Sequence, residues 1–333
     1  MEQLFNQIKA LTKQKRLIPA EEVITRTIIS FEEVLPPILN DSEIEKYEEI
    51  LLGLLYVNSG QVSLQCAVRI ATCLISLYMK QQTPKLWNLF TAVTKKPTTT
   101  GIIVIGHVIN KVGEHSRSMI PGLVKTLVGQ NFDLFSTLFA LDASFKKISN
   151  ELKMYAEKAF LLVKKAFQIN QHQQKNSNSK EEASQLIAIQ LLIGVYSTEA
   201  INHKKIFSFI NEILSSNNAP NYSAYVIDRI CYLIAYCAYY PLKDKQKLST
   251  KINDWDIGGS NKGKNNSDTL FDSTFEILSQ YKATYFPLIF RHFLDFLTPN
   301  FLFNNISLLF NFVRKTQPSE ISQLLYLFGH DVR

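Results

Sequence analysis

Apolar residues recur at helical spacing along nearly the whole chain, and this periodicity limits the folds that the chain can adopt. In the segment AEEVITRTIISFEEVL, one broad apolar stripe is formed by Val23, Ile24, Ile28, Phe31 and Val34. The 333 residues include only 12 glycines and 11 prolines, whereas β-rich folds need many turns built from these residues. The pattern predicts an all-α protein with short connections.

The spacing of the predicted helices indicates how they are arranged. Most connections between them are only a few residues long, so successive helices should pack as antiparallel pairs. Such pairs recur about every 35 to 45 residues, which is typical of HEAT and armadillo repeats. The sequence therefore predicts a right-handed α-solenoid of HEAT-like antiparallel helix pairs, with about 12 to 14 helices in all.

Two polar stretches, 169–181 and 249–268, interrupt the helical pattern. Both are rich in Asn, Ser and Lys and contain little that a core could bury, as in surface loops. The predicted organisation is HEAT-like repeats over 1–168, a polar loop or linker over 169–181, continuing helical repeats over 182–248, a flexible low-complexity loop over 249–268 and aromatic-rich helices over 269–333.

The segment CAVRIATCLISLY at 66–78 carries a resemblance to a known family. This predicted helix is followed by a short helix and then by the segments GIIVIGHVINKVGEHS and IPGLVKTLV. The positions that carry the resemblance are Ala71, Leu74, Leu77, Tyr78, Thr83, Leu86, Leu89, Gly106 and Gly113. This order, within residues 40–170, resembles the early repeats of the HEAT-repeat-containing protein 5 family. The resemblance implies a non-enzymatic scaffold that associates with clathrin adaptor complexes in endosome and trans-Golgi vesicle traffic.

The cysteines do not have the spacing of a metal or disulfide site. Cys66, Cys73, Cys231 and Cys237 include no C-x-x-C pair, which structural zinc sites favour. Cys66 and Cys73 lie two helical turns apart on one face, on the order of 10 Å along the axis. That separation is too long for a disulfide. The pattern predicts thiols buried in a helical core, in a reducing compartment.

No other motif indicates catalysis or cofactor binding. The chain has no nucleotide-binding loop, nucleophile elbow or zinc-binding histidine pair. Adjacent carboxylates such as Glu48 and Glu49 point in different directions on a helix, and we expect them to be solvated. We therefore predict no catalytic, cofactor-binding or metal-binding residues, and a protein that is not an enzyme.

The net charge constrains the partners. With 36 basic and 29 acidic residues the chain carries +7, which favours acidic protein segments and phospholipid surfaces. The lysines are dispersed and no nucleic-acid-binding motif is present, so nucleic acid is not favoured. Every apolar run is shorter than the roughly 20 residues of a membrane span. The first residues lack the apolar run of a secretory signal. We expect a cytoplasmic protein, with the family resemblance implying peripheral association with endosome or Golgi membranes.

Three aromatic residues are candidates for binding another protein. The segment AYVIDRICYLIAYCAYY is aromatic around most of its circumference, so Tyr236 and Tyr240 either pack in a core or face a partner. Trp255 lies between Asp254 and Asp256, either as an ordinary surface loop residue or as an apolar anchor for a partner.

The sequence leaves three functions open. The leading prediction is a non-enzymatic scaffold for protein–protein interaction. One alternative is a compact all-α enzyme or ligand carrier with an inter-helix pocket, which requires convergent polar residues. The other is a nucleic-acid-binding solenoid, whose affinity would fall steeply with salt.

Overall fold

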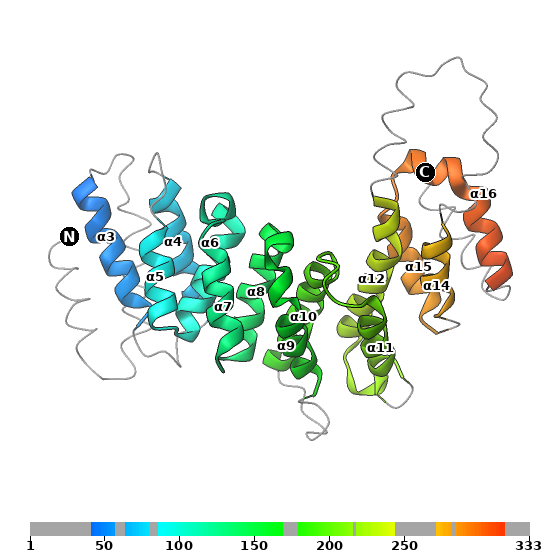
Figure 1. The fold of residues 1–333 in the computed structure, drawn as a ribbon, viewed down its shortest axis with the longest axis horizontal. Helices are drawn as coiled ribbons and strands as arrows, with labels where there is room; N and C mark the ends of the chain where they lie inside the picture. The colour runs from blue at the N-terminus through cyan, green and yellow to red at the C-terminus, as the bar shows by residue number, and fades with distance from the viewer. Residues whose placement is uncertain are drawn as a thin grey trace, which may run out of the picture. The chain divides into compact units, whose positions relative to one another are not determined.

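The computed structural model describes residues 41–56, 64–79, 86–168, 179–215, 218–243, 271–281 and 284–316. These residues form helices and connecting turns and contain no strand, so the all-α prediction is confirmed. The chain divides into two compact units, residues 1–207 (unit 1) and 208–333 (unit 2), which are coloured from blue to red in Figure 1.

The predicted domain boundaries stay predictions. The low-complexity loop at 249–268 and Trp255 lie outside the described residues, as do residues 169–178 of the predicted polar linker. The last three residues of that linker belong to a helix, which begins at Ser179.

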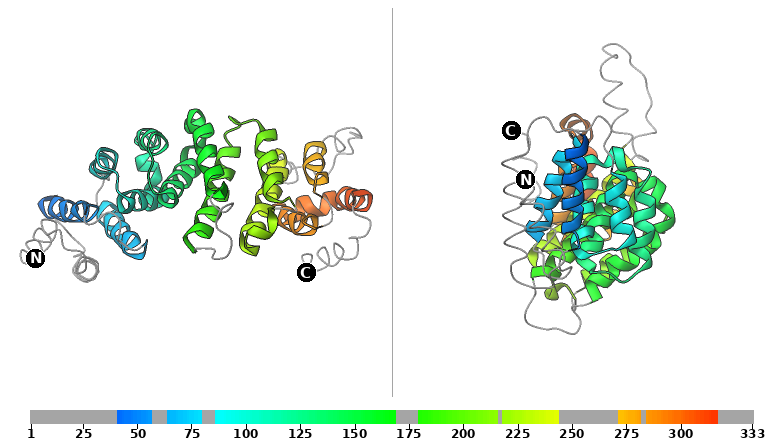
Figure 2. Two further views of the ribbon diagram at one scale, coloured as in Figure 1. Left: turned by 90° about the horizontal axis from the view of Figure 1, so that it is seen from below. Right: turned by 90° about the vertical axis from the view of Figure 1, so that its left-hand side faces the viewer.

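Most helices of unit 1 pack in two rows. The helices of the unit are α3 (Asp41–Leu54), α4 (Leu64–Met79), α5 (Trp87–Lys95), α6 (Thr99–Ser116), α7 (Ile120–Gly129), α8 (Leu134–Ile148), the 3-10 helix η1 (Ser149–Tyr155), α9 (Ala156–Gln168) and α10 (Ser179–Tyr196), with α11 (His203–Ile213) crossing the unit boundary. One row, the α4 row, contains α4, α6, α8 and α10, each in contact with the next, and α3 lies beside α4 at one end of the row. The other, the α5 row, contains α5, α7, η1 and α9. Both rows can be followed in the left panel of Figure 2.

The segment 66–78 occupies the position in unit 1 that its composition predicts. It lies in α4, which contacts α3 on one side and α6 on the other. Cys66, Cys73 and Ile70 are buried there, whereas Arg69 is half-exposed. The helix is apolar around most of its circumference because it has neighbours on more than one side.

Two glycines allow α8 to approach its neighbours closely. A Cβ atom on Gly106 of α6 would lie 2.9 Å from Phe139 Cδ1 and 3.0 Å from Ala140 Cα. A Cβ atom on Gly194 of α10 would lie 2.9 Å from Phe145 Cβ. Contacts this short are not tolerated in a close-packed interior. Because glycine has no side chain, Gly106 and Gly194 allow α6 and α10 to pack this closely against α8.

Glu48 of α3 is buried, whereas its neighbour Glu49 is exposed. The prediction that both are solvated was wrong for Glu48. Successive helical residues point about 100° apart, and this rotation brings Glu48 against α4 and α5. The Tyr78 hydroxyl donates a hydrogen bond to Glu48 Oε1 at 3.0 Å, and Asn88 Nδ2 donates to Oε2 at 3.0 Å. The carboxylate thereby joins three helices.

Side chains at two helix starts also make contacts beyond their own helices. Thr98 Oγ1 accepts a hydrogen bond from the Gly101 N–H at 3.0 Å and donates one to the Leu55 carbonyl at 2.8 Å. Asp133 Oδ2 accepts from the Ser136 N–H at 3.0 Å, and Asp133 Oδ1 lies 2.6 Å from Lys180 Nζ. Both are N-caps, and each also fixes its helix to a distant segment.

The Asp133 cap predicts a pH-dependent contribution to stability. Burial opposes ionisation of this carboxyl group, but the bonds from Lys180 and Ser136 outweigh it and lower its pKa below the ordinary value of 3.8. A carboxylate with a lowered folded-state pKa stabilises the protein above its unfolded-state pKa, and the stabilisation is lost as the pH falls through the folded-state pKa. Asp133→Ala should lower the free energy of unfolding by about 0.5–2 kcal/mol at neutral pH.

Urea unfolding of Asp133→Asn at several pH values checks the direction of this pH dependence. Asparagine can still cap α8 but carries no charge. The variant's free energy of unfolding should be lower than that of the unsubstituted protein at neutral pH. This difference should disappear in the acid range below pH 3.8. A difference that stays constant with pH would contradict the charge-dependent part of this contribution.

Unit 2 is built around α12 (Ala224–Tyr239). The described elements beside it are the 3-10 helices η3 (Ala219–Asn221) and η4 (Tyr240–Leu242), and the helices α14 (Asp272–Ser279), α15 (Phe286–Asp295) and α16 (Pro299–Thr316). α12 packs against α14 and α15, and Thr274 Oγ1 donates a hydrogen bond to the Ala238 carbonyl at 2.8 Å. The Phe312 ring of α16 stacks on Phe275 of α14 with centroids 4.1 Å apart.

Candidate partner-binding site

One face of α12 carries aromatic and charged side chains along its whole length. Tyr225, Arg229, Tyr232 and Tyr236 follow one another at spacings of four, three and four residues, which places them on one side of the helix. We name the tyrosines of this face and of the adjoining turn the α12 aromatic stripe: Tyr225, Tyr232, Tyr236, Tyr239 and Tyr240. The remaining circumference of α12 is core, with buried Val226, Ile230, Cys231, Leu233, Ile234, Ala235, Cys237 and Ala238.

Phe296, at the end of α15, packs on the middle of the stripe. Its ring centroid lies 5.1 Å from that of Tyr232, 5.8 Å from that of Tyr236 and 5.2 Å from that of Tyr239, with which it stacks at 12°. Aromatic contacts of this kind contribute about 0.5–1.5 kcal/mol beyond the burial of area. The three tyrosines stay half-exposed, so Phe296 orients their rings without covering them.

Two cations lie over rings of the stripe. The Arg229 guanidinium carbon is 5.6 Å from the Tyr232 centroid, and Lys243 Nζ is 5.9 Å from the Tyr240 centroid. Both distances are within the range of a cation–π attraction. The stripe therefore combines aromatic rings with two positive charges, one over Tyr232 and one over Tyr240.

A histidine–carboxylate pair adjoins the stripe. His292 Nε2 lies 2.9 Å from Asp228 Oδ1, and His292 Nδ1 lies 3.8 Å from Asp295 Oδ2. The Tyr232 ring meets the imidazole edge-on, with centroids 5.6 Å apart. These contacts connect α12 to α15 and fix the edge of the stripe.

The thiol of Cys231, one helical turn from Asp228 in α12, is not suited to nucleophilic chemistry. Cys231 is completely buried, and burial together with the negative charge of Asp228 raises its pKa to about 12. The nucleophilic form of cysteine is the thiolate, so Cys231 is a packing residue. All four cysteines are buried, as the sequence predicts, and they are free thiols in the structure. Among the described residues no cluster of His, Cys, Asp or Glu could hold a metal ion.

Two of the three predicted partner-binding residues come together here. Tyr236 and Tyr240 have centroids 6.0 Å apart and belong to the same stripe; their role stays a prediction, and so does that of Trp255. The sequence reasoning missed Arg229, Phe296 and His292. The spacing of Arg229 from Tyr225 and Tyr232 signals its position, whereas the other two depend on the packing of α15 against α12.

Comparisons with protein-family models, curated proteins and solved structures find no match for this chain. None of the described helices is both long and apolar enough to cross a bilayer.

Proposed function

We propose that this protein is a non-enzymatic scaffold of the HEAT-like α-solenoid type, and that it binds another protein through the α12 aromatic stripe. The repeat assignment is supported by the contacts within unit 1. Each member of the α4 row contacts the next, and its first three members begin at residues 64, 99 and 134, at equal intervals. Stacked units of similar length are typical of helical-repeat proteins.

The composition and exposure of the stripe carry the binding proposal. Tyrosine and arginine are the residues most enriched, with tryptophan, at the energetic centres of protein interfaces. Here Tyr232, Tyr236 and Tyr239 are half-exposed but already oriented by Phe296. A partner would therefore lose little side-chain entropy of these rings on binding.

The two cations over the stripe favour a partner segment that is apolar and acidic, since the carboxylates at its edge, Asp228 and Asp295, face His292. Arg229 is exposed and Lys243 is half-exposed, so both can pair with carboxylates of a partner. The tyrosine rings of the stripe can contact apolar groups of the same partner. Association with clathrin adaptors, in the cytoplasm and on endosome or Golgi membranes, is the specific form of this proposal. It is supported by the sequence resemblance alone.

Affinity purification from the protein's own cell tests the proposal. Proteins recovered with the unsubstituted chain should be lost with Tyr236→Ala/Tyr240→Ala, and titration of the recovered partner should give at least a tenfold weaker Kd, about the effect of a binding hot spot. Phe303→Ala in α16 is the matched control, because it removes another exposed aromatic ring of unit 2.

Far-UV circular dichroism and thermal melting would establish that both variants are folded. Two results would contradict the proposal: equal recovery of partners by the stripe variant, or a measurable turnover together with no stable partner.

A further inference from the structure

The α5 row of unit 1 has a strongly unequal distribution of charge. Its four elements contain two glutamates, Glu151 and Glu157, and six lysines, namely Lys95, Lys125, Lys153, Lys158, Lys164 and Lys165. α5 and α7 contain no acidic residue.

Both glutamates of this row are already paired with basic residues outside it. Arg117 Nη2 lies 2.6 Å from Glu151 Oε1, and Lys205 Nζ lies 2.9 Å from Glu157 Oε1. Arg117 follows α6, and Lys205 belongs to the part of α11 in unit 1. The row's own lysines are thus left without these carboxylates as partners.

Two acids at α8, in the neighbouring row, are also engaged. Asp133 pairs with Lys180, and Asp142 pairs with Lys146. Five lysines of the α5 row are exposed and form no ion pair with a described residue: Lys95, Lys125, Lys153, Lys158 and Lys165. The positive charge of the row is therefore not neutralised by the described part of the chain.

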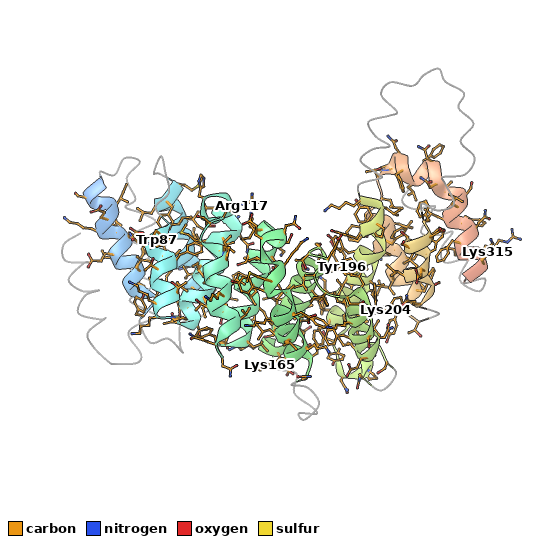
Figure 3. The ribbon with its side chains drawn as sticks, in the orientation of Figure 1. Trp87, Arg117, Lys165, Tyr196, Lys204 and Lys315 are labelled. Atoms are coloured by element: carbon orange, nitrogen blue, oxygen red, sulfur yellow. The ribbon has the colours of Figure 1, made fainter. Side chains whose placement is uncertain are left out.

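The same row carries three exposed large apolar side chains. Trp87 of α5 is 68% exposed, Met154 of η1 77% and Leu161 of α9 62%. Figure 3 labels Trp87 and Lys165, near the two ends of the row. Exposed apolar residues are ordinary when they are single, but these three belong to the same row of helices as the five unpaired lysines.

We propose that the α5 row is a docking surface for an anionic membrane. Basic residues are attracted to the negative surface of lipid headgroups, and Trp, Met and Leu side chains insert at the boundary between headgroups and acyl chains. A bilayer offers both interactions over an extended area, and the exposed lysines and apolar side chains of the row are likewise spread over four elements. This proposal concerns unit 1 and does not depend on the protein-binding site of unit 2.

Nucleic acid fits these side chains less well. Single-stranded nucleic acids bind in basic grooves in which several aromatic side chains stack on successive bases. The α5 row exposes one large aromatic ring, Trp87, and two aliphatic side chains. Arginine is the main residue for reading bases, and Arg117 is engaged with Glu151.

Flotation of the full chain with vesicles tests the proposal. The probes are vesicles of phosphatidylcholine alone and of three parts phosphatidylcholine to one part phosphatidylserine. We expect binding to the mixed vesicles only, weakening as salt is raised. Lys125→Glu/Lys158→Glu/Lys165→Glu should reduce the partition coefficient by about a hundredfold, given the attraction of each basic residue to an anionic surface.

The matched control is Arg291→Glu/Arg314→Glu/Lys315→Glu in unit 2, where all three side chains are exposed. It changes the net charge equally and leaves the α5 row intact, so it should keep the partition coefficient within about twofold. Equal loss in both variants would overturn the proposal in favour of a net-charge effect. Equal binding to both kinds of vesicle would also overturn it.

Tryptophan fluorescence separates a membrane from other anionic partners. The chain has two tryptophans, so Trp255→Phe leaves Trp87 as the only source of emission. With mixed vesicles the emission of Trp87 should shift to shorter wavelength, as an indole at the membrane interface leaves water. The proposal is overturned if the emission does not shift, or if poly(U) RNA displaces the protein from the vesicles and binds with the same lysine dependence.

Discussion

Gly194→Ala is expected to lower the free energy of unfolding by about 1–3 kcal/mol, the usual cost of overpacking a core. The added Cβ would lie 2.9 Å from the Cβ of Phe145. A Cβ atom is fixed to its backbone, so Phe145 cannot avoid the contact by changing rotamer. α10 and α8 would have to separate, and the buried contacts between them would be weakened. Urea unfolding followed by far-UV circular dichroism measures the loss.

Gly122→Ala in α7 provides the control for this prediction. A Cβ at Gly122 would meet nothing within 4 Å, so only the backbone effect remains. Alanine is a better helix former than glycine by up to about 1 kcal/mol, and this variant should be slightly stabilised. If both substitutions stabilise the protein, α10 does not approach α8 as closely as described.

The rows of unit 1 illustrate what helical periodicity can predict. The pattern of 66–78 is sufficient to identify α4 as a helix surrounded by others, because its apolar residues cover more than one face. The same pattern cannot identify Glu48 as buried. That depends on a hydroxyl donor 30 residues away and an amide donor 40 residues away, and no local spacing reports such partners.

In the candidate site of unit 2, too, some residues can be predicted from the sequence and others cannot. Its tyrosines are regularly spaced along one helix, so the sequence alone places Tyr236 and Tyr240 together. Phe296 and His292 belong to another helix, and His292 meets Asp228 across 64 residues of chain. Their contribution follows from the packing of α15 on α12, which periodicity does not determine.

The two proposed surfaces are built from different chemistry, and this makes them separable by experiment. The α12 aromatic stripe presents oriented rings with two cations, which suits a protein segment. The α5 row presents unpaired lysines around isolated apolar tips, which suits lipid headgroups. Substitutions in one surface leave the residues of the other unchanged, so loss of partner recovery and loss of vesicle binding can be assigned independently.

Tyr78→Phe is expected to cost about 1–3 kcal/mol, the penalty for leaving a buried polar group without its hydrogen bond. Phenylalanine retains the buried ring and removes only the hydroxyl that donates to Glu48 Oε1 at 3.0 Å. Both side chains are buried, so water cannot easily replace the donor. Equilibrium unfolding in urea gives the change, and Tyr155→Phe, at a half-buried tyrosine of η1, should change the stability by less than about 0.5 kcal/mol.

A double-mutant cycle distinguishes the hydrogen bond from a packing defect. In Glu48→Met/Tyr78→Phe the acceptor is removed together with the Tyr78 donor, and replacing both by apolar groups of similar shape can be nearly neutral. Asn88, which also donates to Glu48, is exposed and can donate to water instead. The double variant should therefore be more stable than Tyr78→Phe alone, with a coupling energy of about 0.5–3 kcal/mol, as for residues in direct contact. Strictly additive losses would indicate that the effect of removing the Tyr78 hydroxyl does not depend on Glu48, and would contradict the role assigned to this hydrogen bond.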